Sequence, residues 1–242
     1  MDSEITSSDG GRILFDASRV TMPGPELFQA EHWPDRRLLQ GGRGQVCLVD
    51  YGEQAWLIKS YLRGGFVRHF VARSYLFLGY GRTRMFREFR LLNYLIARGV
   101  PVPRPIAAWV KRSGLGYGGS IIIERLEGVQ PLSELIRDRR LPAAQWQALG
   151  RCVARLHGEQ VNHKDLNASN LLLDDSRVFI IDFDRCARQL WGSARYRRAN
   201  LRRLIDHCPD WRPAVPTSVT MTGITSCQAM AVNSPDPVQP RP

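Results

Sequence analysis

One stretch of the chain, residues 163–184, constrains its fold more than any other. His163, Asp165 and Asn170 precede a run of three leucines, and Asp182 ends the next apolar run, which is rich in β-branched residues. The two runs read as two strands, and the polar residues between them read as a hairpin turn. Asp165 and Asp182 are therefore expected near the ends of one short β-hairpin, where both carboxylates can face a single cleft.

The spacing of these residues is typical of one kind of chemistry. The segment reads as the loop H-x-D-L-x-x-x-N of kinase-type phosphotransferases, and an Asp-Phe metal site follows it. Phosphoryl transfer needs one residue to orient the attacking hydroxyl and others to hold Mg²⁺ on the phosphates of ATP. We predict that Asp165 does the first and that Asn170 and Asp182 do the second. His163 and Lys164 would support the loop, and ATP and Mg²⁺ are the expected cofactors.

An ordinary polar turn is the alternative interpretation of this segment. Asp and Asn are common turn formers, and His163 could be a buried structural histidine. A turn alone, however, explains neither the offsets between the His, the Asp and the Asn nor the second Asp after a β-rich run. The phosphotransferase interpretation is therefore the stronger of the two.

The composition adds a strong positive charge. The net charge is +11 over 242 residues, which implies an anionic partner such as nucleic acid, an anionic membrane surface, or a phosphorylated or carboxylated substrate. A basic surface can also serve solubility alone. The five cysteines form no C-x-x-C pair, which favours a reduced, cytosolic chain. No apolar run of about 18 residues is present, and the acidic, polar N-terminus does not predict a signal peptide.

The pattern along the chain divides it into four parts. We expect an N-terminal extension over residues 1–35, a β-rich lobe over 36–127, a helical lobe over 128–212 and a disordered tail over 213–242. The tail is expected because Pro, Ser and Thr dominate there and hydrophobic periodicity vanishes. Apolar spacing predicts strands at 12–16, 55–61 and 120–124, a glycine turn within 41–49, and helices at 25–30, 84–98, 132–139, 143–158 and 196–207.

The β-rich lobe supplies candidate nucleotide contacts. Gly42 and Gly44 form a tight turn whose backbone N–H groups could approach phosphates, although most such turns are only hairpins. Lys59 follows fifteen residues after Gly44 and could reach the α- and β-phosphates; the alternative is a solvent-facing lysine. Its expected partner is Glu88, which could instead be a surface carboxylate on its helix. Glu124 falls where adenine would meet the interlobe hinge.

The chain resembles the protein-kinase-like superfamily and, more narrowly, the 3-deoxy-D-manno-octulosonic acid (Kdo) kinases of the bacterial lipopolysaccharide core kinase family. The resemblance rests on residues 163–170, 181–184 and 82–89 and covers about residues 35–205. It implies an α+β, two-lobed protein-kinase-like fold with a β-rich N-lobe and a helical, shortened C-lobe. It also implies transfer of the ATP γ-phosphate to the 4-hydroxyl of Kdo on Kdo-lipid A precursor, by a peripheral protein at the cytoplasmic face of the bacterial inner membrane.

Departures from the protein-kinase pattern bear on the acceptor. Asp184 replaces the glycine that follows Asp-Phe, and Lys164 stands where protein kinases often carry an arginine that docks a phosphorylated loop. No Ala-Pro-Glu follows, so a platform for a protein substrate is not expected. Eight arginines in residues 185–212 fit an anionic acceptor beside an anionic bilayer, although a solvated helix face is the alternative. Arginine candidates for this contact are Arg82, Arg84, Arg185 and Arg188.

Two other functions stay open on the sequence alone. The first is a related kinase for another acceptor, such as a core heptose or an aminoglycoside. The second is a non-catalytic nucleotide or nucleic-acid binding protein whose charge serves RNA or DNA. The sequence carries no recognised nucleic-acid motif and no interleaving of aromatic and basic residues, so no nucleic-acid partner is expected.

Overall fold

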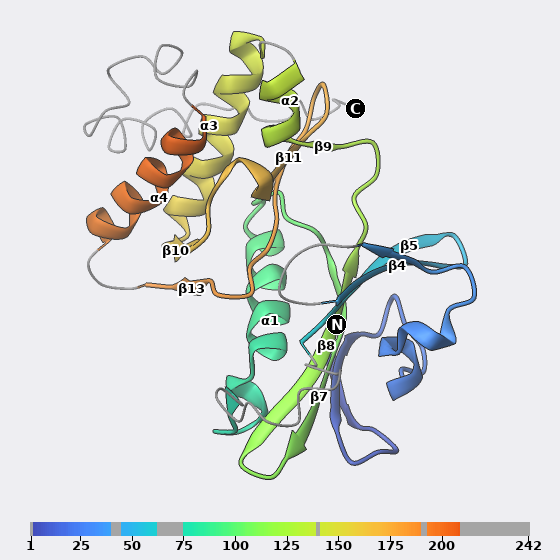
Figure 1. Ribbon diagram of the computed structural model, residues 1–242. Helices are drawn as coiled ribbons and strands as arrows, with labels where there is room; N and C mark the ends of the chain where they lie inside the picture. The colour runs from blue at the N-terminus through green and yellow to red at the C-terminus, as the bar shows by residue number, and fades with distance from the viewer. Residues whose placement is uncertain (1, 40–44, 62–74, 139–140, 190–192, 209–242) are drawn as a thin grey trace, which may run out of the picture.

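The computed structural model describes residues 2–39, 45–61, 75–138, 141–189 and 193–208, which form a β-rich lobe followed by a helical lobe (Figure 1). The β-rich lobe is built on one antiparallel sheet in the order β1-β2-β7-β8-β5-β4-β3, with β6 paired to β8 outside this order. Its strands are β1 (Asp2–Thr6), β2 (Arg12–Asp16), β3 (Arg37–Leu39), β4 (Gln45–Tyr51), β5 (Gln54–Ser60), β6 (Tyr75–Leu76), β7 (Pro105–Ser113) and β8 (Gly116–Glu124).

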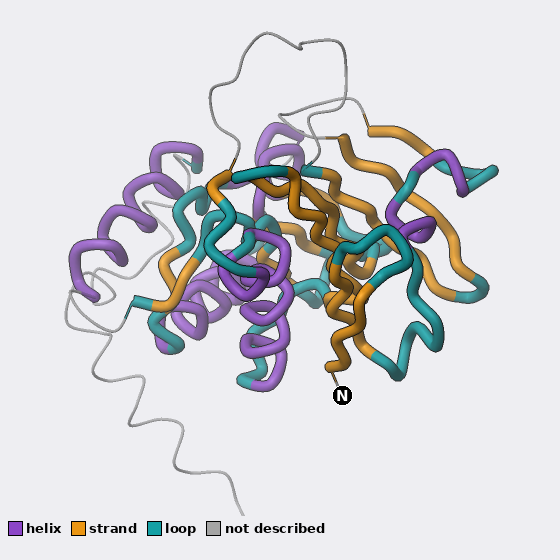
Figure 2. Tube along the Cα trace, turned by 90° about the horizontal axis from the view of Figure 1, so that it is seen from below, coloured by secondary structure: helices purple, strands orange, loops and turns teal. Residues whose placement is uncertain are grey.

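Both faces of this sheet are buried. Because side chains alternate along a strand, Ile121 and Ile123 of β8 pack on the same side as helix α1 (Arg84–Ala97), whereas Ile122 packs with Trp56 on the other side. Figure 2 shows the strands of this sheet gathered on one side of the molecule and most of the helices on the other. Helix α1 is therefore fixed between the sheet and the helical lobe, where its side chains can reach the space between them.

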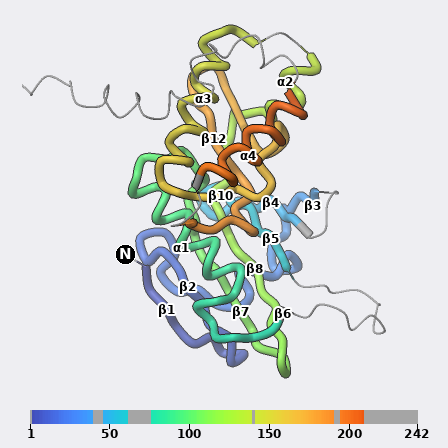
Figure 3. Tube along the Cα trace, turned by 90° about the vertical axis from the view of Figure 1, so that its left-hand side faces the viewer, coloured from blue at the N-terminus to red at the C-terminus, as the bar shows by residue number. Residues whose placement is uncertain are grey.

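Residues 1–35, expected as an N-terminal extension, contribute two strands to this sheet. Strand β2 pairs with β7 through partners such as Ile13 and Trp109, and Figure 3 shows β1 and β2 alongside β7. Ile13 and Phe15 are buried in the core on the face opposite α1. Residues 1–35 are therefore part of the β-rich lobe, and a domain boundary at residue 35 would cut through its sheet.

The helix expected at residues 25–30 is present in the 3₁₀ form and not as a continuous α-helix. Two short 3₁₀ helices, Pro25–Phe28 and Ala30–His32, occupy this region. Proline fixes the first turn but cannot donate a backbone hydrogen bond, and Phe28 is the only large apolar side chain of the two helices that is fully buried. A longer α-helix would need a continuous apolar face, which this segment lacks.

The helical lobe follows a short connection after β8. It contains α2 (Leu132–Asp138), α3 (Ala143–Gly158) and α4 (Ser193–His207), and it also contains the short strands β9 (Gln130–Pro131), β10 (Val161–Asn162), β11 (Leu171–Leu173), β12 (Val178–Ile180) and β13 (Ala187–Arg188). Strands β12, β11 and β9 form one small sheet, and β10 pairs with β13. Helix α3 has the predicted bounds, and the predicted hairpin is present as β11 and β12.

Several sequence expectations concern what the described residues lack. Cys47, Cys152 and Cys186 are buried free thiols, and Cys208 is buried as well; the reduced state stays a prediction. No helix among the described ranges is long and apolar enough to cross a membrane. Gly42, Gly44 and the tail at 213–242 lie outside the described residues, so the predictions made for them stay predictions.

Candidate active site

His163 joins the two acidic segments of the site. Its side chain is fully buried, and its Nε2 lies 2.9 Å from the carbonyl oxygen of Ile181. Burial lowers the pKa of His163, so the neutral ring donates this hydrogen bond through Nε2–H. The ring also packs edge-on against Phe183. The loop that carries Asp165 is thereby fixed to the segment that carries Asp182, as predicted for a supporting residue.

Asp165 and Asn170 are held by hydrogen bonds within one tight turn. Asn167 accepts bonds from the backbone N–H groups of Ser169 (2.9 Å) and Asn170 (3.2 Å), and its own amide lies 3.3 Å from Asp165 Oδ1. Asn170 donates from Nδ2 to the carbonyl oxygen of Asp165 at 2.8 Å. This bond fixes the amide so that its Oδ1 stays available to a cation, while Asp165 is exposed at the surface of the loop. Asn167 was not predicted, although its capping position can be read from the sequence.

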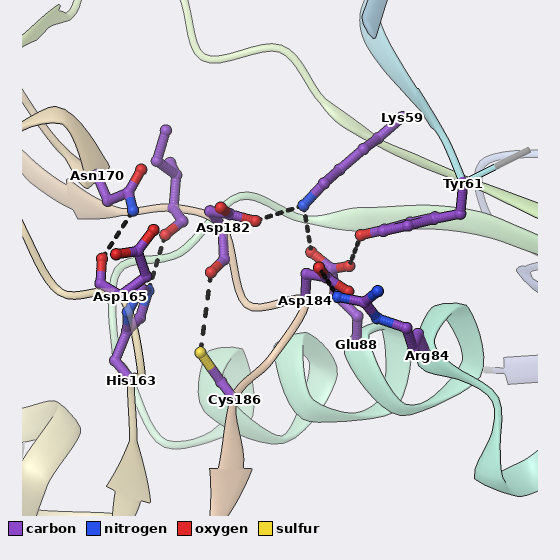
Figure 4. Close-up of polar contacts among 11 residues, drawn as sticks. Lys59, Tyr61, Arg84, Glu88, His163, Asp165, Asn170, Asp182, Asp184 and Cys186 are labelled. Atoms are coloured by element: carbon purple, nitrogen blue, oxygen red, sulfur yellow. Dashed lines mark hydrogen bonds and ion pairs between the residues drawn. The ribbon is translucent and has the colours of Figure 1, made fainter. Parts of the chain in front are cut away.

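Lys59 connects the two lobes. From β5, it forms an ion pair with Asp182 of the helical lobe, and its Nζ lies 3.7 Å from Oε1 of Glu88 on α1 (Figure 4). Burial alone would lower the pKa of Lys59, but the carboxylates of Glu88 and Asp182 outweigh burial and raise it. Lys59 is therefore a cation, and the structure brings it together with Glu88 as the sequence suggested.

Glu88 is not a surface carboxylate of its helix. Its side chain is 2% exposed, and Tyr61 donates a hydrogen bond of 2.7 Å from its hydroxyl to Glu88 Oε2. Burial raises the pKa of Glu88, an effect that the nearby Lys59 opposes. Tyr61 was missed by the sequence reasoning because an aromatic residue at the end of an apolar strand carries no visible signal of this role.

Arg84 pairs with Asp184 and not with Glu88. The ion pair joins the first turn of α1 to the segment after β12, and both side chains are mostly buried, 19% and 15% exposed. Asp184 Oδ1 is buried without a hydrogen-bond partner among the described residues. Arg84 therefore has a role within the site, and a contact between Arg84 and the acceptor stays a prediction. Arg188, another arginine candidate, stacks its guanidinium over the ring of Tyr94.

Asp182 and Asn170 offer donors that suit Mg²⁺. Asp182 has a left-handed backbone (φ 65°), a conformation that Asp and Asn adopt more readily than most residues. Burial raises the pKa of Asp182, but Lys59 together with His163 and Arg84 outweighs burial, so that the pKa is lowered overall. Within the described ranges, no group of three or more His, Cys, Asp and Glu side chains could hold a metal by itself. One carboxylate and one amide oxygen fit Mg²⁺, which usually takes its other ligands from phosphates and water.

Glu124 lies at the corner where β8 leaves the sheet. It is paired in register with Trp56 of β5, and Lys59 is three residues further along that strand. Because side chains alternate, the Glu124 side chain lies on the face opposite Lys59. Its Oε2 accepts a bond of 3.3 Å from the backbone N–H of Arg104. A contact between Glu124 and adenine stays a prediction.

Asn200 attaches α4 to the catalytic loop. Its Oδ1 lies 3.3 Å from both the backbone nitrogen of His163 and Nε2 of His157, and its Nδ2 donates to Asn162 at 3.1 Å. Asn200 is 1% exposed. Burial lowers the pKa of His157 to about 4, so that this ring is a neutral donor. The sequence showed α4 only as an arginine-rich helix and gave no sign of this anchor.

These features define a phosphotransferase of the protein-kinase-like class: a Lys–Glu pair in a β-rich lobe faces an Asp–Asn loop and an Asp-Phe segment in a helical lobe. The model of the lipopolysaccharide kinase (Kdo/WaaP) family matches residues 37–216, and the chain belongs to this family. The family and fold predictions are therefore confirmed.

Relatives and solved structures agree with this assignment. The chain is 41% identical over 201 residues to a 3-deoxy-D-manno-octulosonic acid kinase of Stenotrophomonas maltophilia, covering 81% of this chain and 79% of the relative. A protein of the same name from Vibrio parahaemolyticus is 38% identical over 197 residues, with coverage of 80% and 82%. WaaP in complex with acyl carrier protein superposes with a TM-score of 0.58 at 18% identity, over 84% of this chain and 89% of that one. Rio2 kinase from Chaetomium thermophilum superposes with a TM-score of 0.54 at 19% identity, over 80% of this chain and 60% of that one.

Proposed function

We propose that this protein transfers the γ-phosphate of ATP to the 4-hydroxyl of Kdo on Kdo-lipid A precursor, in the assembly of the lipopolysaccharide core. The observation that carries the proposal is the meeting of Lys59, Asp182 and the Asp165 loop across the two lobes. Membership of the lipopolysaccharide kinase family and relatives named for Kdo support the acceptor. The position of the hydroxyl follows from the sequence resemblance.

The side chains of the β-rich lobe would bind the nucleotide. Lys59 is a buried cation held by Glu88 and Asp182, and it would move its contact from Asp182 to the α- and β-phosphates. Glu88 then keeps the ammonium group in place. Because Tyr61 in turn fixes Glu88, the whole chain of contacts can be in position before ATP arrives.

The helical lobe would bind the metal and orient the acceptor. Asp182 and Asn170 would hold Mg²⁺, which neutralises charge on the transferred phosphoryl group when bound. Asp165, exposed beside them, would accept a hydrogen bond from the sugar hydroxyl and align it with the phosphorus. The hydroxyl proton leaves late in a loose transition state, so that position matters more than basicity. Asp165 needs only to be ionised.

A peripheral position at the cytoplasmic face of the inner membrane is part of this proposal. Arg195, Arg198 and Arg202 are all exposed on α4, and their spacing of three and four residues places them on one face of the helix. Such a stripe would attract anionic lipids, each basic residue near the surface contributing about 1 kcal/mol. This arrangement would hold the kinase beside an acceptor that is itself embedded in the bilayer.

The direct test is the identity of the phosphorylated product. Purified protein, ATP and Mg²⁺ are incubated with Kdo-lipid A precursor, with a heptose-bearing core acceptor and with an aminoglycoside, and the mass and linkage of each product are determined. We expect phosphate on the 4-hydroxyl of Kdo and none on the other two. Phosphate only on a non-Kdo acceptor would favour the related-kinase alternative and refute the Kdo assignment.

A second measurement addresses the non-catalytic alternative. A nucleic-acid binding protein would bind polynucleotides with an affinity that falls steeply with salt, and would transfer no phosphate. Phosphate transfer to any acceptor, lost in Asp165→Asn, excludes that function as the main one. Equal activity of Asp165→Asn and wild type would refute the proposed mechanism.

A further inference from the structure

A cavity of about 330 Å³ opens between the catalytic loop and α4. Its wall includes Lys164, next to the proposed catalytic Asp165 in the chain, and Arg185, which directly follows Asp184. Helix α4 contributes Tyr196 and Arg203. The cavity is therefore built from the two segments that carry the site and from the helix that Asn200 anchors to them. We call this cavity the anion pocket.

The charge of the anion pocket is entirely positive. Lys164, Arg185 and Arg203 line it, and the lining includes neither Asp nor Glu. None of these three residues forms an ion pair with a carboxylate among the described residues, although Arg84 and Arg125 elsewhere do. Three cations that have no carboxylate partner in the described part of the chain surround one concavity, and they produce a positive potential that attracts an anion.

Two residues that line the anion pocket each carry a buried donor that has no partner among the described residues. The Tyr196 residue is 6% exposed, and its hydroxyl has no hydrogen-bond partner in the part of the chain that the structure describes. The same holds for Nη1 of Arg203. A buried polar group left unsatisfied costs about 1–3 kcal/mol. A ligand oxygen that accepts from both groups would remove that cost.

The wall around these donors is already fixed. Asn162 and Asn200, which also line the cavity, satisfy each other through a hydrogen bond of 3.1 Å. The Tyr196 ring packs edge-on against His157, with 6.0 Å between ring centroids. The Tyr196 hydroxyl and Nη1 of Arg203 are shielded from solvent, so a ligand would reach them after a local shift of these two side chains, on a framework that is otherwise held in place.

We propose that the anion pocket binds a carboxylate carried by the acceptor sugar itself. This inference rests on the proposed function and names the group by which the acceptor is recognised. An ulosonic acid carries its carboxylate on the anomeric carbon, two ring positions from the 4-hydroxyl. Lys164 and Asp165 are adjacent in the chain and both exposed, so in this proposal one pyranose ring spans from the cavity, which takes the carboxylate, to Asp165, which takes the hydroxyl. A planar carboxylate also matches the fork of an arginine.

The anion pocket would select acceptor sugars that carry a carboxylate. A neutral heptose presents hydroxyl groups but no carboxylate, so it would leave Tyr196 and Arg203 unsatisfied. A site built for a polar group rejects analogues that lack it, because its own buried groups then stay unpaired. Kdo would therefore be distinguished from a neutral core sugar at this pocket.

The test measures binding before turnover. Isothermal titration calorimetry follows binding of the α-methyl glycoside of Kdo, and of its methyl ester, to the full chain in the presence of ADP and Mg²⁺. The variants are Tyr196→Phe and Arg203→Gln. Arg151→Gln is the matched control, because Arg151 is exposed on α3, does not line the pocket and loses the same charge.

Each pocket variant should weaken binding of the acid by a factor of about ten to a hundred or more, since a hydrogen bond to a charged group contributes about 1.5–3 kcal/mol. Binding of the ester should be weak in wild type and unchanged in the variants, and Arg151→Gln should equal wild type. In turnover assays, the KM for the acceptor should rise while the KM for ATP stays constant. Tyr196→Phe should melt no lower than wild type, because it removes an unpaired buried hydroxyl.

Three outcomes would overturn the inference. Wild type could bind the ester as well as the acid, or Tyr196→Phe and Arg203→Gln could bind the acid as wild type does. An effect of the variants on a phosphorylated lipid acceptor but not on the glycoside would assign the pocket to phosphate instead of carboxylate. The proposed function fails separately: acid binding that depends on Tyr196 and Arg203, without phosphate transfer to Kdo, would keep the pocket and refute the kinase assignment.

Discussion

Arg84 and Asp184 form an ion pair across the two lobes, between residues one hundred positions apart in the chain. The pair lies beside the contacts that join Lys59 to Glu88 and Asp182. Helix α1 is thus tied to the metal-binding segment at two points, through Lys59 and through Arg84. The protein-kinase pattern has a glycine at the position of Asp184. Because glycine carries no carboxylate, the second connection exists only with this replacement.

We expect the Arg84–Asp184 pair to stabilise the fold and the nucleotide site together. Arg84→Gln and Asp184→Asn should each raise the KM for ATP, and the double variant should be little worse than either single one. A double-mutant cycle on urea unfolding should give a coupling energy of about 1–3 kcal/mol. The exposed pair Arg137–Asp138, 73% and 72% exposed, should give no measurable coupling. Additive effects at Arg84 and Asp184 would contradict this interpretation.

The hydroxyl of Tyr61 should matter because it serves a buried carboxylate. Tyr61→Phe leaves Glu88 without its donor, and we expect a loss of about 1–3 kcal/mol in the free energy of unfolding. The activity should fall through a higher KM for ATP. Tyr94→Phe is the matched control, because Tyr94 donates a similar bond of 2.7 Å to Glu159, whose side chain is 22% exposed. Equal losses in the two variants would show that burial of the carboxylate is unimportant.

Asn170 should set the requirement for Mg²⁺. Asn170→Ala removes one proposed ligand and the bond to the Asp165 carbonyl, so we expect the Mg²⁺ concentration for half-maximal activity to rise about tenfold or more, as a lost metal contact of about 1.4 kcal/mol would produce. Chelation should abolish activity in both proteins. Asn93→Ala, on α1 near Asp2, should keep the wild-type Mg²⁺ dependence. An unchanged requirement in Asn170→Ala would remove Asn170 from the metal site.

Stability should fall in acid because His157 is buried as a neutral ring. Burial lowers its pKa from 6.5 to about 4, so the unfolded chain binds the extra proton between these values. The free energy of unfolding should therefore be at its full value above pH 6.5 and fall towards pH 4, by about 3 kcal/mol in total from this residue. Urea unfolding at several pH values should show a smaller slope in His157→Gln.

The exposed His32 provides the control for that experiment. His32→Gln should reproduce the pH dependence of wild type. Burial also lowers the pKa of His163, which acts in the same direction, so a residual slope in His157→Gln is expected. A slope that is unaffected by His157→Gln would show that this ring does not titrate as described.

The stripe on α4 should bind anionic membranes. Replacing its three arginines by glutamine should lower affinity for vesicles of anionic phospholipid at least tenfold, since each contributes about 1 kcal/mol near the surface. Activity on a short, lipid-free acceptor should not change. The control removes the same charge at three exposed positions elsewhere, Arg104, Arg112 and Arg137. Equal losses in both triple variants would indicate a non-specific effect of net charge.

The sequence predicted the parts of the site that depend on local spacing. Asp165, Asn170 and Asp182 lie in one short segment, and a hairpin of fixed length brings them together. Lys59 and Glu88 were harder, because the choice between a surface pair and a buried pair depends on how α1 packs. Because α1 packs on the sheet, Glu88 lies beside Lys59 of β5, and the buried pair forms.

Distant partners could not be predicted from spacing. Asn200 bonds to His163 from 37 positions away, and Tyr196 is a core residue by pattern alone. Strand β7 was also missed, because both of its faces are buried and Ile106 to Val110 show no alternation of polar and apolar residues. These features depend on three-dimensional packing that a single sequence does not display.

The pairing of β2 with β7 has a consequence for the order of synthesis. Ile13 of β2 is paired in register with Trp109 of β7. Because these residues are far apart in the chain, the hairpin of β1 and β2 leaves the ribosome long before its partner strand β7 is made. Until β7 has emerged, the apolar side chains of β2 have no sheet to cover them, and such surfaces are prone to aggregate. The β-rich lobe can therefore close only after its last strands are made, and slow translation before residue 105 should increase the need for a chaperone.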